Sequence, residues 1–364
     1  MHTFGGMEKR ITLLQLEKFV SGVFMAMGCP LDDAAVATRA LVAADLRGID
    51  SHGVARLSGY VRLWEAGRIN ARPEIRILHE SPSTAVIDGD GGLGLVVAPW
   101  AMKVAIAKAG LAGTGWVAVC NSNHFGIAAH HAMMALDHGM TGMAMTNASA
   151  IVAPTFSAER LLGTNPICYA IPAGEEPPFV ADFATTTAAN GKLEILQRKG
   201  ADTPDGWLQD AHGKPVNDAH ALRNGGALLP LGGDREHGSH KGFALGAIVD
   251  ILSGVFSGAN YGPWVPPFPA YVPMPENQPG RGLGHFLGAM RVDAFRPAEA
   301  FRADMDRWIR RFRTARPVTG SEHVIIPGDP ERESEAERRV HGIPLLPVVW
   351  DDLRTVGEKF GISL

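Results

Sequence analysis

The sequence DLRGIDSHGVARLSGY, residues 45–60, places several reactive side chains close together. Asp50 is a suitable N-cap residue, so a helix is predicted to begin there. His52, Arg56 and Tyr60 recur every four residues, which puts them on one stripe of that helix. In the first turn the helix dipole would disfavour the imidazolium form of His52. The pattern predicts a general base, a cation and a phenol pointing the same way, with a plain amphipathic surface helix as the alternative.

Composition narrows the class of protein. The chain of 364 residues is 46% hydrophobic and 20% charged, which is ordinary for a globular protein with a large core. Its formal charge of −4 gives no sign of a nucleic-acid or membrane partner. The widely spaced cysteines indicate reduced thiols, the N-terminus lacks an apolar signal segment, and the apolar run 243–256 is too short for a membrane span. We therefore expect a cytoplasmic protein with neither of those partners.

Short strands and helices are mixed along the chain, which is typical of the α/β class. Helices are expected at 11–28, 31–47, 50–67, 96–109, 127–138, 191–197, 241–256, 298–313, 332–340 and 351–360. Strands are expected at 83–88, 116–121, 140–147, 167–171, 179–183 and 286–292. Residues 199–240 are expected to be rich in loops. The Pro/Gly-rich segment 257–284 is too long for a simple connection, so it should serve a function or cover an interface.

Residues 89–94, GDGGLG, match the glycine pattern of a Rossmann nucleotide loop between a predicted strand and a predicted helix. The acidic residue expected about 20 positions later, which would bind the ribose, is missing. Chance matches are common in a chain with 43 glycines. A glycine-rich turn is therefore the favoured interpretation.

Other polar residues lie at predicted strand ends and turns. His124 follows the strand 116–121, and loops at strand ends often hold the sites of α/β sheets. Asn165 precedes a proline, which predicts an extended backbone that presents its polar groups to a ligand. Asp182 would orient a histidine or, alternatively, cap a helix. Lys241 at a predicted helix start favours a phosphate-binding site, with a basic loop as the alternative.

The histidines at 124, 130, 131 and 138 have no usual zinc spacing, so we expect no metal site. A metal-dependent hydrolase that uses this stretch is a distant alternative. A binding protein without catalytic activity is a third class.

Six segments, in this order, resemble the type-2 malate/L-lactate dehydrogenase family: DSHGVARLSGY, NSNHFG, GTNP, VADFATT, HKGFALGAIVDILSG and IIPGDPE. The resemblance extends over about residues 10–360. It implies an α/β fold with a mixed-sheet, non-Rossmann NAD(P)-binding domain like that of L-sulfolactate dehydrogenase. It also implies a helical region in 1–75 that packs with the helices of 298–364, a cofactor-binding core in 76–297, and a homodimer.

The resemblance also suggests residue roles. His52 or His124 would carry the proton, assisted by Ser51 and Asp182. The substrate would be bound by Arg56, whose planar guanidinium suits a carboxylate, and by Tyr60, Thr164 and Asn165. Cofactor contacts are implied at Val180, Ala181, Asp182, Phe183, Ala184, Thr185, Thr186, His240, Lys241, Gly328, Asp329 and Pro330.

The expected function is an NAD(P)-dependent oxidoreductase that transfers a hydride between nicotinamide and C2 of a small 2-hydroxy or 2-oxo acid. Malate and oxaloacetate are the favoured substrate pair, and NAD is favoured over NADP. Reduction of a cyclic imino acid, or of sulfopyruvate or pyruvate, is the alternative.

Overall fold

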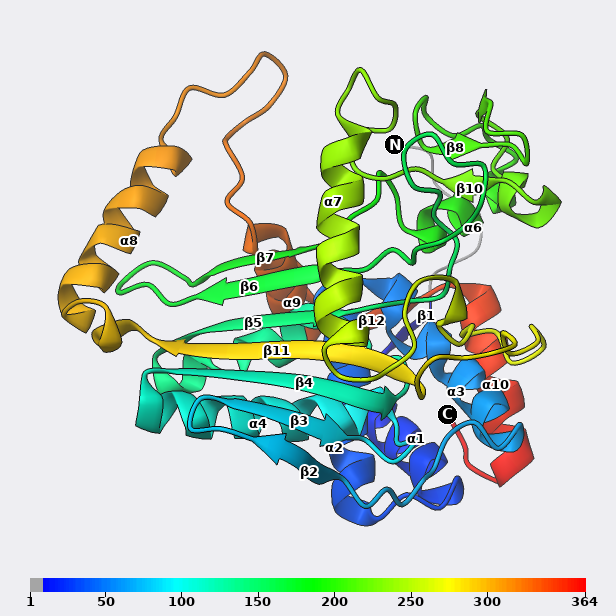
Figure 1. Ribbon diagram of the computed structural model, residues 1–364, viewed down its shortest axis with the longest axis horizontal. Helices are drawn as coiled ribbons and strands as arrows, with labels where there is room; N and C mark the ends of the chain where they lie inside the picture. The colour runs from blue at the N-terminus through cyan, green and yellow to red at the C-terminus, as the bar shows by residue number, and fades with distance from the viewer. Residues whose placement is uncertain (1–8) are drawn as a thin grey trace.

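The computed structural model describes residues 9–364 and is built around a seven-stranded mixed sheet (Figure 1). In spatial order its strands are β2 (Arg76–Glu80), β3 (Thr84–Asp88), β4 (Thr114–Ser122), β11 (Leu283–Arg291), β5 (Met140–Thr146), β6 (Ile167–Ile171) and β7 (Phe179–Phe183). β3 and β4 run parallel, whereas the other neighbouring strands run antiparallel. A Rossmann sheet is parallel throughout its nucleotide-binding units. The expected mixed, non-Rossmann α/β fold is confirmed.

Several short strands were not predicted from the sequence. β1 (Lys9–Ile11) pairs with β12 (Ile343–Leu345) and joins the two ends of the described chain. The region expected to be rich in loops holds a small sheet of β8 (Leu208–Gln209), β9 (Pro215–Val216) and β10 (Ala227–Leu228). Strands of two or three residues are too short to show an alternating pattern. β2 was missed because all of its residues are exposed, so it has no buried face to mark it.

Helices cover both faces of the sheet. α4 (Gly94–Ala112) packs on β4 and β11, and α5 (Ala128–Met133) packs on β5 and β6. α7 (Ser239–Asp250), with the π-helical turn Ile251–Val255, crosses the other face (Figure 1). α4 is long and apolar enough to span a membrane by composition alone, but here it is a core helix that packs on the sheet.

The remaining helices gather at two ends of the molecule. α1 (Leu13–Ala26) and α3 (Leu57–Glu65) contact α10 (Pro347–Phe360), and α2 (Leu31–Leu46) contacts α9 (Asp329–His341). α8 (Ala298–Arg313) lies away from them (Figure 1).

The position of α8 differs from the expectation that all of 298–364 packs with the N-terminal helices. Its Trp308 ring packs edge-to-face on Phe179, and its Asp306 accepts hydrogen bonds from the amides of residues 174–176. These contacts fix α8 to the β6–β7 hairpin, at the far end of the sheet. The division of the chain near residue 75 stays a prediction.

Candidate active site

The segment that follows Asp45 is not one continuous helix. Asp50–His52 and Val54–Arg56 are separate 3₁₀ turns, and α3 begins only at Leu57. The break is at Gly53, where an added Cβ would lie 2.2 Å from the carboxylate oxygens of the buried Asp45. The prediction of a helix over 50–67 with one polar stripe is therefore wrong, because packing against Asp45 bends the chain at this glycine.

The bent segment brings two histidines together. The rings of His52 and His124 stack, with centroids 5.8 Å apart and an interplanar angle of 22°. The Ser51 Oγ lies 2.9 Å from Nδ1 of His52, and the hydroxyl of the buried Tyr60 lies 2.7 Å from Nδ1 of His124. Each ring is thus held through Nδ1. Nε2 of each ring is the nitrogen left to meet a substrate, because the described residues supply it with no hydrogen-bond partner.

The hydrogen bonds fix the tautomer of His124 and leave that of His52 open. The amide of Gly126 donates to Nδ1 of His124 over 3.3 Å, so this nitrogen carries a lone pair. The proton of neutral His124 therefore lies on Nε2, which makes this ring a donor. Nδ1 of His52 faces the Ser51 hydroxyl, which accepts hydrogen bonds as well as donating them. His52 is thus free to hold its proton on Nδ1 and to present the Nε2 lone pair as a base.

Both histidines are neutral near pH 7. Burial, with a smaller effect of the nearby Arg56 charge, lowers the pKa of His52 to about 4. Burial and then the neighbouring His52 and Arg56 lower the pKa of His124 well below its ordinary value. A neutral His52 was expected, but from the helix dipole. The cause is burial, because His52 ends a 3₁₀ turn and does not begin an α-helix.

Arg56 is fixed beside this histidine pair. Its Nε donates to the Ser51 carbonyl over 2.6 Å, and its Nη1 lies 3.9 Å from Oε1 of Glu194 on α6 (Asn190–Lys199). α6 approaches so closely that an added Cβ at Gly191 would lie 2.6 Å from the Ser51 Cβ. Arg56 therefore lies near the two histidines, whose pKa values its charge lowers, and its contact with Glu194 is long.

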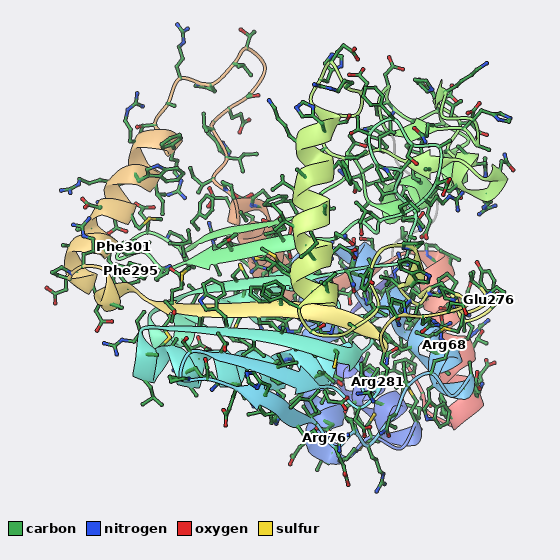
Figure 2. The ribbon with its side chains drawn as sticks, in the orientation of Figure 1. Arg68, Arg76, Glu276, Arg281, Phe295 and Phe301 are labelled. Carbon is green, nitrogen blue, oxygen red and sulfur yellow. The ribbon has the colours of Figure 1, made fainter. Side chains whose placement is uncertain are left out.

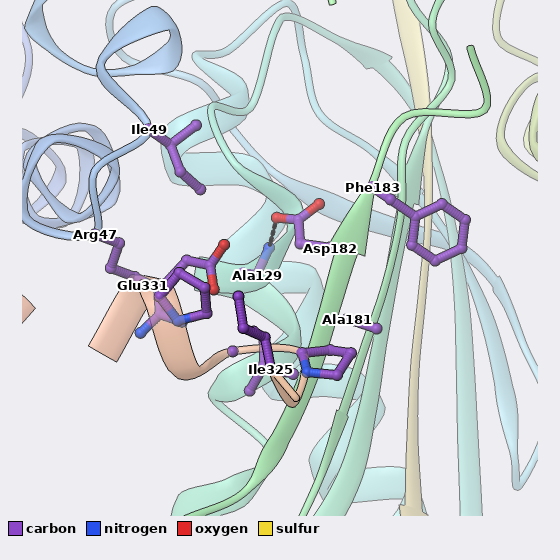
Figure 3. Close-up of a pocket in the computed structure, with 12 residues that line it drawn as sticks. Arg47, Ile49, Ala129, Ala181, Asp182, Phe183, Ile325 and Glu331 are labelled. Atoms are coloured by element: carbon purple, nitrogen blue, oxygen red, sulfur yellow. Dashed lines mark hydrogen bonds between the residues drawn. The ribbon is translucent and has the colours of Figure 1, made fainter. Parts of the chain in front are cut away.

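A cavity of about 290 Å³ lies beside the segment that leads into His52, with Arg47 and Ile49 in its lining (Figure 3). It is lined by Arg47, Ile49, Ala129, Val180, Ala181, Asp182, Phe183, Ile325, Pro327, Gly328, Pro330 and Glu331. Much of the predicted cofactor-binding set is thus brought to one place. The carbonyl of Ile49 accepts a hydrogen bond from the amide of His52 over 3.0 Å, so the cavity and the histidine pair share a segment.

Arg47 is the candidate that sequence reasoning missed. Its side chain is 5% exposed and its Nη1 lies 3.3 Å from Glu335, while its Nε and Nη2 are buried without a hydrogen-bond partner among the described residues. Buried donors without partners are costly in free energy, so these two nitrogens are suited to a ligand. A cofactor with acceptor oxygens fits this lining. The only sequence signal was a cation at the end of an apolar helix.

Asp182 lies in the cavity lining, but its carboxylate holds α5. It accepts a hydrogen bond from the amide of Ala129 over 2.7 Å (Figure 3), although Asp182 lies on β7 and is not itself the N-cap residue of a helix. Burial raises the pKa of Asp182 to about 6 despite this bond. Neither His52 nor His124 is among its hydrogen-bond partners in the described structure.

Asn165 is used inside the protein. Its φ of 37° is left-handed, so the predicted extended backbone is wrong. Its Oδ1 accepts from the amide of Ala148 over 3.1 Å, and its Nδ2 donates to the carbonyl of Gly246 over 3.0 Å. The carbonyl of Thr164 accepts from both the amide and the hydroxyl of Thr185. The amide of Asn165 is therefore committed to fixing this turn against α7 and is not presented to a ligand.

The other predicted cofactor residues lie outside the cavity lining. Asp329 forms ion pairs with Arg313 and Arg332. Nδ1 of His240 accepts a hydrogen bond from Arg235 over 2.9 Å at the start of α7, where Lys241 is exposed. Ala184, Thr185 and Thr186 continue from β7 into the interior of the molecule.

The GDGGLG segment positions the loop that carries His124. The Asn123 side chain donates to the carbonyls of Gly91 and Gly92 over 2.8 and 3.0 Å. An added Cβ at Gly94, the first residue of α4, would lie 2.1 Å from the Asn123 carbonyl oxygen and 2.6 Å from that of His124. The segment is thus a glycine-rich turn packed against the active-site loop. Within residues 9–364, no group of three His, Cys, Asp or Glu side chains is arranged to hold a metal ion.

Comparison with known proteins shows which family has this sequence and fold. The chain is 41% identical to malate dehydrogenase from Pyrococcus abyssi over 355 residues, covering 97% of this chain and 96% of that protein. It is 35% identical to L-sulfolactate dehydrogenase from Methanocaldococcus jannaschii over 349 residues, covering 96% of each. The structure of malate dehydrogenase from Pyrococcus horikoshii OT3 superposes with a TM-score of 0.89 at 36% identity, covering 100% of this chain and 99% of that one. Since the family model described as malate/L-lactate dehydrogenase also matches residues 11–354, the chain belongs to that family and is a 2-hydroxyacid dehydrogenase.

Proposed function

We propose that the enzyme interconverts malate and oxaloacetate with NAD. The observation that carries this proposal is the stacked pair of His52 and His124 beside Arg56, together with the cavity beside the segment that leads into His52, which holds much of the predicted cofactor-binding set. Malate is favoured because the Pyrococcus relatives with 41% and 40% identity carry the name malate dehydrogenase.

The arrangement supports different roles for the two histidines in the reaction. Arg56 would bind the carboxylate of the substrate through its terminal nitrogens. His124 would donate a hydrogen bond from its Nε2–H to the oxygen on C2 and keep its proton, and Nε2 of His52 would accept the hydroxyl proton during oxidation. When bound, a nicotinamide supplies the acceptor or donor of the hydride at C2. In the reverse direction His52 returns the proton to the same oxygen.

The charges around the cavity support NAD over NADP. Two carboxylates, Asp182 and Glu331, face the cavity together with Arg47. Carboxylates accept hydrogen bonds from ribose hydroxyls and repel a 2′-phosphate. The size of the cavity, about 290 Å³, is at the lower end of small-molecule sites, so it would hold one part of the dinucleotide.

Replacing Arg47 with methionine is expected to weaken NADH binding about 10- to 150-fold. The guanidinium would lose a charge-assisted hydrogen bond to the cofactor from its unpartnered Nε or Nη2, worth roughly 1.5–3 kcal/mol in total. The matched control is Arg339→Met, since Arg339 also pairs with Glu335 but is half exposed and lies outside the cavity lining. NADH titration by fluorescence measures both. An equal dissociation constant for the two variants would remove Arg47 from the cofactor site.

The substrate assignment is tested by following NADH and NADPH absorbance with a panel of oxaloacetate, pyruvate, sulfopyruvate and a cyclic imino acid. We expect oxaloacetate with NADH to have the highest kcat/KM. Reduction of a cyclic imino acid is the second candidate, because the same His52 would protonate a nitrogen in place of an oxygen. A higher kcat/KM for another member of the panel would replace malate as the substrate.

A homodimer is proposed from the outer surface of α7. Apolar side chains are exposed along α7 and its π-helical turn at Leu245, Ile248, Ile251, Val255 and Phe256. A contiguous apolar surface of this kind marks an interface in most proteins.

The three buried, unpaired cysteines, Cys29, Cys120 and Cys168, agree with a reducing cytoplasmic location.

A further inference from the structure

The Pro/Gly-rich segment 257–284 brings one aromatic side chain, Phe268, into the active site. The amide of Phe268 donates to Oγ of Ser149 over 2.9 Å. The carbonyl of the preceding Pro267 accepts a hydrogen bond from the guanidinium of Arg68. Figure 2 shows Arg68 at the same end of the molecule as Glu276 of this segment. The peptide bond between Pro267 and Phe268 is therefore held at both its carbonyl and its amide, which fixes the backbone where it enters Phe268.

The ring of Phe268 forms a wall beside the catalytic pair. Its centroid is 5.0 Å from the ring of His124 and 5.4 Å from the ring of Tyr60, which it meets edge-on at 87°. Gly59 makes room for it, since an added Cβ there would lie 2.6 and 2.7 Å from the outer ring atoms. The side chain is only half-buried, so the protein does not cover the ring completely.

We infer that Phe268 is a specificity-determining residue that limits the size of the C3 substituent of the substrate. This inference rests on the proposed function. With the substrate carboxylate on Arg56 and its C2 oxygen between His52 and His124, the remaining substituent must share the space beside His124 with the ring.

The ring has two consequences for the reaction. A phenyl group has no hydrogen-bonding atom, so it excludes water from the donor His124 without competing for its Nε2 proton. A bulky acid, or a cyclic imino acid whose ring includes C2, requires the volume that Phe268 occupies. The wall therefore selects small open-chain acids.

The test compares Phe268→Ala with Tyr271→Ala, a control from the same segment whose side chain is 86% exposed. Each variant and the unaltered enzyme are assayed with oxaloacetate, 2-oxo-4-methylpentanoate and a six-membered cyclic imino acid, and the dissociation constant of NADH is measured separately. We expect Phe268→Ala to raise the kcat/KM ratio of bulky to small substrates at least about 10-fold, the scale of one or two methylene groups in a pocket. Tyr271→Ala should leave the ratio unchanged, and NADH affinity should be the same in all three proteins.

Each outcome decides between a specific role and a structural one. A uniform loss of activity on all substrates, with an unchanged ratio, would overturn the inference. Phe268→Leu, which keeps an apolar side chain, repeats the test if the alanine variant does not fold, and a smaller shift in the same direction is then expected. If the unaltered enzyme turns over none of these substrates while it still binds NADH, the proposed function fails and this inference fails with it.

Discussion

Replacing His52 with alanine is expected to lower turnover by about 10²- to 10⁴-fold, the usual contribution of a general acid or base. His52 is the ring whose Nε2 is free to accept a proton, because its Nδ1 faces the Ser51 hydroxyl. His124→Ala should also lower turnover, but through loss of a donor to the substrate oxygen, since its Nδ1 accepts from Gly126. The rates of both variants are measured at saturating substrate and cofactor.

The two variants are separated by their pH profiles. The His124→Ala enzyme should keep the dependence on pH that the unaltered enzyme shows, because His52 is still present. The His52→Ala enzyme should lose it. A His52→Ala enzyme that retains a substantial rate and the original profile would assign the proton to His124.

Replacing Gly94 with alanine is expected to lower both the melting temperature and the activity. The new Cβ would lie 2.1 Å from the carbonyl oxygen of Asn123 and 2.6 Å from that of His124, and both are backbone atoms that move only with the whole loop. Overpacking of this kind costs about 1–3 kcal/mol. The activity falls because the shift displaces the His124 ring from Tyr60 and His52.

The control for Gly94 is Gly110 in the same helix. An added Cβ at Gly110 meets no atom within 4 Å. Because alanine has the better helix propensity, Gly110→Ala should raise the free energy of unfolding by up to about 1 kcal/mol, and with it the melting temperature. Thermal unfolding and kcat are measured for both variants. A Gly94→Ala enzyme as stable and as active as Gly110→Ala would show that the GDGGLG turn does not position His124.

Sequence patterns predicted the helices and strands that are determined by residues close together in the chain. The strands 167–171 and 179–183 and the helix 298–313 have the predicted bounds, because apolar or amphipathic runs and clear end signals mark them. The two-residue and three-residue strands carry no such pattern, so they were found only in the structure.

The errors arose where distant residues decide the backbone. A helix over 50–67 satisfied every local rule, yet Gly53 is bent by contact with Asp45. Asn165 is left-handed because its amide is held between Ala148 and α7. These contacts join segments that sequence spacing alone does not bring together.

The candidate site was predicted in its parts but not in its assembly. His52, Arg56, Tyr60 and His124 were all named from the sequence, and they do meet in one site. The hydrogen bond between Tyr60 and His124 spans 64 positions, so local reasoning did not show that the phenol holds the His124 ring. Arg47 was missed for the same reason, since the cavity that it lines is formed by residues from across the chain.

The central claim is that a half-buried, neutral His52 carries the proton, and the pH dependence of kcat/KM in both directions tests it most directly. Oxidation needs neutral His52, so the kcat/KM of oxidation should reach its full value above the His52 pKa of about 4 and fall below that pKa. Reduction needs protonated His52, so its kcat/KM should rise about tenfold for each unit as the pH falls from 8 towards 5, while that of oxidation stays level. An inflection of both profiles near 6.5, the pKa of an exposed histidine, would contradict this account.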